Sequence, residues 1–116
     1  MHAPEMKIAA TTVRVPVFRS HSEAVNLELD NPMTPSEARE LLSKSPGIIV
    51  QDDPARNLYP MPRFTSDTDE VYVGRIRRDI STDNGLVMWI VSDQIRKGAA
   101  TNCIQIAELL LKEKLF

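Results

Sequence analysis

The chain has little of several features that define whole classes of proteins. Its 116 residues contain one cysteine, Cys103, and no apolar run near the roughly 18 residues of a membrane span. A single cysteine cannot form a disulfide within the chain, and a lone free thiol is typical of proteins in a reducing compartment. The first ten residues lack the apolar core of a signal peptide. We therefore expect a soluble, cytoplasmic protein.

Glycine and metal-ligating residues are also scarce. The four glycines are Gly47, Gly74, Gly85 and Gly98. They stand far apart, so the chain has no glycine-rich loop for phosphate. His2 lies near the N-terminus, and one cysteine with one further histidine, His21, makes no ligand set of recognisable spacing. We expect no metal site.

A strong charge of either sign is missing as well. The formal net charge is -2, which provides no basic face for nucleic acid or for an anionic membrane. The arginines at positions 75, 77 and 78 form only a local cluster. With 42% hydrophobic and 26% charged residues, the composition is that of an ordinary globular protein, long enough for one domain over residues 1–116.

The stretch TTVRVPVFRSHSEAVNLEL, residues 11–29, predicts two strands separated by a turn at residues 19–22. Arg14 lies inside the first, valine-rich strand, where a guanidinium is costly unless it meets an anion. Its planar fork fits the carboxylate of a ligand. The alternative partner is an internal acid such as Glu28 or Asp30.

His21 falls at the predicted break between those strands. An unperturbed histidine titrates near neutral pH, so His21 is a candidate general acid or base, and a structural or surface role is the alternative. Seven residues separate it from Arg14, and an unbroken strand would send the two side chains to opposite faces. Only a turn could bring them to one ligand.

The middle of the chain predicts a helix, a short strand and a long polar stretch. Thr34, Pro35 and Glu37 form a helix start with a capping box, and the helix ends before Pro46. A brief apolar strand follows over residues 47–50. Residues 52–69 show no clear period, and a loop of this length either covers a partner or a site, or is exposed to solvent.

Two further strands and a helix complete the prediction. Residues 71–76 and 86–91 indicate strands, and LVMWIV in the second is apolar on both faces, which favours a central or an interface strand. Residues 99–116 predict a helix with a wide apolar surface, which marks an interaction site. The fold is therefore α+β, with a mixed, largely antiparallel sheet and two helices.

Two residues of this last helix, Asn102 and Cys103, carry side chains that could take part in chemistry. Cys103 lies between apolar neighbours, where a thiol is most often a small hydrophobe and a poor nucleophile. Asn102 lies at a helix start, where its amide and backbone N–H groups could meet a cofactor. The alternative is a capped helix with Asn102 in solvent.

Four ordered motifs together resemble the C-terminal part of the aspartate-semialdehyde dehydrogenase family. They are VRVPVFRSHSEAVNLEL, DDPARNLYPMP, VYVGRIRRDIS and NGLVMWIVSDQIRKGAATNCIQIAELL. The resemblance runs from about Thr11 to Leu111. It implies part of a glyceraldehyde-3-phosphate-dehydrogenase-like C-terminal domain, used for catalysis and dimerisation.

The resemblance also implies a site and a reaction. Arg14 would hold the substrate carboxylate, His21 would act as acid/base, and Asn102 would lie beside the nicotinamide end of NADP. The family reduces aspartyl phosphate to aspartate semialdehyde with NADPH, on the route to lysine, threonine and methionine. A homodimer or higher homo-oligomer is expected, without nucleic acid or membrane.

The chain also departs from the family pattern. The cysteine that forms the thioester and the Rossmann domain that binds NADP both lie upstream of the matched region, and neither motif is present in residues 1–116. The resemblance therefore predicts a C-terminal catalytic and dimerisation part that is inactive alone. The alternative is a noncatalytic module that self-associates through the exposed interface.

Overall fold

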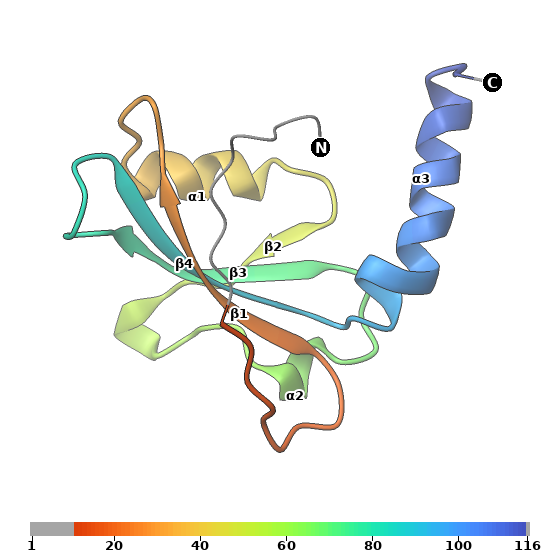
Figure 1. Ribbon diagram of the computed structural model, residues 1–116, viewed down its shortest axis with the longest axis horizontal. Coiled ribbons are helices and arrows are strands. Elements are labelled where there is room, and N and C mark those ends of the chain that lie inside the picture. The colour runs from red at the N-terminus through yellow and green to blue at the C-terminus, as the bar shows by residue number, and fades with distance from the viewer. Residues whose placement is uncertain (1–10, 116) are drawn as a thin grey trace.

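A four-stranded sheet organises the computed structural model, which describes residues 11–115 (Figure 1). Its strands are β1 (His21–Glu28), β2 (Ile48–Val50), β3 (Val71–Arg78) and β4 (Gly85–Ser92). The order across the sheet is β1-β4-β3-β2, with β4 antiparallel to both neighbours and β2 parallel to β3. The predicted mixed, largely antiparallel sheet is confirmed.

The central position of β4 explains why LVMWIV is apolar on both faces. On one face Leu86 and Met88 pack with Val73 of β3 and Ala38 of helix α1 in the hydrophobic core. Val91 points to the other face and is fully buried. Successive side chains alternate between faces, so a strand covered on both sides needs apolar residues at every position.

Helix α1 (Pro35–Ser43) begins at the predicted capping box. The backbone N–H of Glu37 donates to Thr34 Oγ1 at 3.2 Å, and the backbone N–H of Thr34 donates to Glu37 Oε2 at 2.7 Å. These bonds satisfy two N–H groups that have no partner inside the helix. The helix then lays Ala38 against the sheet core.

A bulge interrupts β3 beside α1. The pairing of β3 with β4 shifts between Gly74 and Arg77, and Arg75 adopts φ 53°. The carboxylate of Asp52 accepts hydrogen bonds from the backbone N–H groups of Arg75 at 2.7 Å and Ile76 at 3.2 Å. Arg39 of α1 donates to the same carboxylate at 2.7 Å. Asp52 therefore replaces the ladder bonds that the bulge removes.

The polar stretch 52–69 folds back on the sheet, although its sequence shows no period. It contains the short helices η1 (Pro54–Arg56) and α2 (Pro62–Thr65). Pro60 and Thr65 are fully buried, and Trp89 of β4 donates a hydrogen bond of 3.1 Å to the carbonyl of Pro60. This stretch therefore packs on β4 through Pro60 and Thr65, while residues 54–58 are exposed, and a role in covering a partner or a site stays a prediction.

The prediction of a strand over residues 11–18 is wrong. Residues 11–20 contain no strand, and β1 begins at His21, where a break was expected. A strand needs a neighbour for its backbone groups, and within the described part of the chain no strand pairs with this segment. The alternation of valines alone does not supply that neighbour.

Helix α3 (Thr101–Lys112) follows the irregular turn η2 (Arg96–Ala100) and projects away from the sheet (Figure 1). It has no buried residue, and Ile104, Leu109 and Leu111 are all more than half exposed. Cys103 is a free thiol and is exposed too. No helix within residues 11–115 has the length and apolar character needed to cross a membrane.

Candidate functional site

The structure places the three predicted site residues on different elements. Arg14 is exposed in the irregular segment before β1, His21 is the exposed first residue of β1, and Asn102 is half-buried in the first turn of α3. Among residues 11–115, no hydrogen bond or ion pair joins any two of them. Arg14 also pairs with neither Glu28 nor Asp30, so the internal partners considered for it are absent from this part of the chain.

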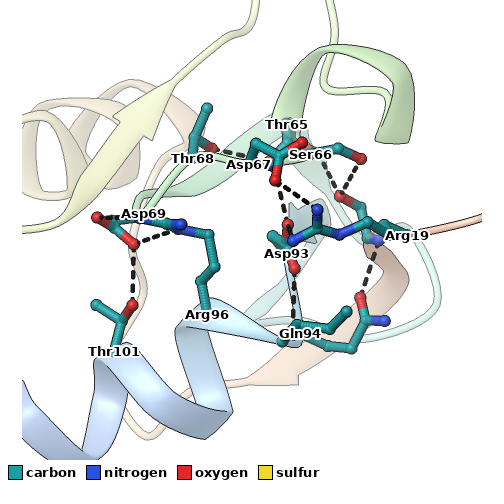
Figure 2. Close-up of polar contacts among 12 residues, drawn as sticks. Arg19, Thr65, Ser66, Asp67, Thr68, Asp69, Asp93, Gln94, Arg96 and Thr101 are labelled. Atoms are coloured by element: carbon teal, nitrogen blue, oxygen red, sulfur yellow. Dashed lines mark hydrogen bonds and ion pairs between the residues drawn. The ribbon is translucent and has the colours of Figure 1, made fainter.

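Arg19, just before His21, is bound to the far end of β4. Its guanidinium pairs with Asp93 at 2.8 Å and also with Asp67 (Figure 2). The Asp93 side chain is 0% exposed, whereas that of Asp67 is 71% exposed. A buried carboxylate needs such partners, because an isolated charge in the interior is strongly unfavourable.

Backbone groups complete the surroundings of Asp93. The N–H groups of Asp67 and Ile95 donate to its two oxygens at 2.8 and 3.0 Å. Burial by itself raises the pKa of Asp93, but these hydrogen bonds and the charge of Arg19 outweigh burial and lower the pKa below its ordinary value. Asp93 is therefore held as a carboxylate at neutral pH.

Ser20 joins the same network through backbone and side chain. Its N–H donates to Gln94 Oε1 at 2.8 Å, and its hydroxyl lies 3.1 Å from those of both Thr65 and Ser66. Ser66 in turn donates to the carbonyl of Pro62 at 2.8 Å. The hydroxyls therefore form a directed chain, in which Thr65 donates to Ser20 and Ser20 donates to Ser66.

A second pair fixes the start of α3. Arg96 donates two hydrogen bonds to Asp69, at 2.6 and 3.0 Å, and Thr101 donates a third at 3.0 Å (Figure 2). The bonds from Arg96 and then from Thr101 lower the pKa of Asp69. Asp69 therefore holds the turn before α3 beside the end of the 52–69 stretch. Thr101, which it binds, is adjacent to the half-buried Asn102.

Residues 65–69 connect the surroundings of two predicted site residues. This short segment contacts Arg19 and Ser20 next to His21, and it contacts Arg96 and Thr101 next to Asn102. Among residues 11–115 the half-buried Asn102 side chain makes no hydrogen bond. The same segment therefore lies beside the turns that precede both His21 and Asn102. Arg14, on the irregular segment, is not held by it.

Sequence reasoning missed Arg19, Asp69, Asp93 and Arg96. Each is an ordinary charged residue next to a turn. Their separations in the sequence follow no pattern that would predict which of them form ion pairs. The one available signal was SD at the end of an apolar strand, because a carboxylate directly after a buried strand often bonds the backbone of the following turn.

The fold belongs to a known class of protein. A family model described as "Semialdehyde dehydrogenase, dimerisation domain" matches residues 1–97. The chain belongs to this family of semialdehyde dehydrogenase dimerisation domains. The resemblance read from its motifs is confirmed.

The curated relatives that this chain matches are aspartate-semialdehyde dehydrogenases. An aspartate-semialdehyde dehydrogenase of Aquifex aeolicus (strain VF5) is 55% identical over 115 residues, which are 99% of this chain and 34% of that protein. The chain thus spans about a third of the length of the curated relatives that it matches.

Solved structures agree with this assignment. Aspartate semialdehyde dehydrogenase II of Vibrio cholerae, complexed with ASA, is 42% identical with a TM-score of 0.78, over 85% of this chain and 29% of that one. Aspartate semialdehyde dehydrogenase of Candida albicans, solved with NADP, is 30% identical with a TM-score of 0.71, over 89% and 33%. The predicted α+β fold of this family is confirmed.

Proposed function

We propose that this chain is the catalytic and dimerisation part of an NADP-dependent aspartate-semialdehyde dehydrogenase. The reaction is the reductive dephosphorylation of aspartyl phosphate to aspartate semialdehyde. The observation that carries the proposal is the 55% identity with the Aquifex aeolicus enzyme across 99% of this chain. Homodimerisation of the whole enzyme is part of the proposal and is supported by the family's description. The predicted cytoplasmic location stays a prediction.

Arg14 and His21 have distinct roles in this proposal. Arg14 grips the substrate carboxylate at two points, which suits a side chain that is exposed and has no acidic partner among residues 11–115. His21 takes the proton of the attacking thiol and returns it when the thiol leaves. The exposed imidazole of His21 is open to such an exchange, and the network around Arg19 and Ser20 supports the backbone that carries it.

NADPH supplies the hydride that reduces the thioester formed when a cysteine thiolate displaces phosphate from the acyl carbon. The resemblance to the family implies that Asn102 would lie beside the nicotinamide. Residues 1–116 contain no glycine-rich loop for the pyrophosphate. In this proposal the chain therefore contacts only the nicotinamide end of the dinucleotide. Most of the cofactor is therefore assigned to a Rossmann domain, which residues 1–116 lack.

The chain alone is inactive in this proposal because it has no suitable nucleophile. Cys103 is exposed on α3, and no cation that would activate its thiol is bonded to it within residues 11–115. The noncatalytic self-association module remains the second candidate. It is favoured by one observation, the unburied apolar surface of α3.

A chimera tests the proposed function. The third of the Aquifex aeolicus enzyme that matches this chain would be replaced by residues 1–116, and NADP reduction would be followed with aspartate semialdehyde and phosphate. We expect turnover from the chimera and none from the chain alone. A chimera with the unfolding temperature and oligomeric state of its parent but without turnover would contradict the proposal and favour the module.

A further inference from the structure

We propose that Asp93 is a positioning residue for His21, acting through Arg19 and Ser20. The inference rests on the proposed acid/base role of His21 and adds the residues that set where its backbone lies. None of these three residues needs to touch the substrate.

The buried charge pair provides the anchor. Asp93 is 0% exposed at the end of β4, and it binds the Arg19 guanidinium at 2.8 Å while accepting two backbone N–H groups. Bonds between charged groups are about twice as strong as neutral ones and have a narrower geometry. Arg19 therefore has one well-defined position relative to β4.

Ser20 transmits that position to His21. Its φ is 74°, in the left-handed region that a serine seldom adopts, and its side chain is almost fully buried. Its N–H is held by Gln94 and its hydroxyl by Thr65 and Ser66. The unusual conformation persists because Ser20 is bonded on both its backbone and its side chain.

The pairing of β1 with β4 links the position of Ser20 to that of His21. His21 is the first residue of β1 and lies directly across from Ser92, the neighbour of Asp93 on β4. Ser20 therefore sets the direction in which the chain enters the ladder, and the ladder begins at His21. Loss of the Asp93 charge would leave Arg19 with the exposed Asp67 as its one ion-pair partner among residues 11–115. A misplacement of about 1 Å at a reacting group can lower a rate about a hundredfold.

A second buried pair supplies a matched control. Asp52 is 2% exposed, binds Arg39 at 2.7 Å and also accepts two backbone N–H groups, those of Arg75 and Ile76. Its chemistry closely parallels that of Asp93. It lies at the bulge of β3, away from the pairing of His21 with Ser92.

Amide hydrogen exchange on the chain itself tests the anchor. In Asp93→Asn we expect exchange of the Ser20 amide to accelerate at least about tenfold, with the Ile76 amide changed less than about twofold. In Asp52→Asn the Ile76 amide should accelerate and the Ser20 amide should not. Equal acceleration of Ser20 in both variants, or none in Asp93→Asn, would overturn the proposal.

Kinetics in the Aquifex aeolicus chimera separate this inference from the proposed function. We expect Asp93→Asn to lower kcat about 10- to 100-fold with the substrate KM within about twofold, and Asp52→Asn to leave kcat within about threefold. Unchanged kcat in His21→Ala would refute the acid/base role itself. A loss in His21→Ala, with Asp93→Asn no worse than Asp52→Asn, would overturn the positioning role alone.

Discussion

Asn26 of β1 donates a hydrogen bond of 2.9 Å to Asp79, which lies just after β3. The same carboxylate accepts bonds from the hydroxyl of Ser81 at 2.6 Å and from its backbone N–H at 2.9 Å. Asp79 thereby ties the edge strand β1 to the turn between β3 and β4. The hydroxyl of Ser81, then the Asn26 amide and the Ser81 N–H, lower the pKa of Asp79 to about 2.

Asp79 should make stability depend on pH in the acid range. Its pKa falls from 3.8 in the unfolded chain to about 2 when folded, so its contribution is complete above 3.8 and is lost as pH falls through about 2. Urea unfolding midpoints between pH 2 and pH 5 measure this dependence. We expect Asp79→Asn to give a flatter profile over that interval. An identical profile would refute this role.

Arg14→Lys should impair turnover in the chimera more than a conservative exchange of cations implies. An ammonium cannot reproduce the two-point grip of a guanidinium on a carboxylate. Loss of one charge-assisted hydrogen bond costs about 1.5 to 3 kcal/mol, or roughly tenfold to a hundredfold in kcat/KM. Steady-state kinetics with varied aspartate semialdehyde measure the effect, and unchanged constants would remove Arg14 from the site.

His21→Ala should lower turnover of the chimera by about 10² to 10⁴-fold if its imidazole is the acid/base. Folding should change little, because the side chain is exposed at the start of β1. The comparison pairs kcat/KM with the unfolding midpoint of the same variant. A large loss of stability with a modest kinetic effect would support the structural alternative.

The chain alone should self-associate and show no dehydrogenase activity. Ile104, Leu109 and Leu111 of α3 are 61%, 56% and 67% exposed. At about 25 cal/mol per Å², burial of a patch of several hundred Å² favours association by several kcal/mol before association costs. A symmetric dimer is the expected closed assembly.

Light scattering with size exclusion at micromolar concentrations measures this association. Leu111→Glu should weaken it, whereas Leu41→Glu, at the 57% exposed Leu41 on α1, should not. A stable wild-type monomer that binds no apolar dye would contradict the interface. NADPH-dependent turnover by the chain alone would contradict its predicted incompleteness.

The sequence by itself determined the elements whose signals lie between near neighbours in the chain. The capping box of Thr34 and Glu37 was readable because its partners are three residues apart. The apolar residues on both faces of β4 predicted a central or an interface strand, and the sheet order shows the central one. The family was readable because four motifs occur in order. Arg14, His21 and Asn102 were candidates from their local sequence, and the resemblance implied their particular roles.

Only the tertiary structure decided how the candidate site is supported. The bond between Ser20 and Gln94 joins residues 74 positions apart, and no local pattern encodes which distant group closes such a contact. The same limit explains the strand wrongly predicted over residues 11–18, whose alternating valines are a local signal. A strand requires a neighbouring backbone, and the folded arrangement of the described chain provides one for His21 but not for Arg14.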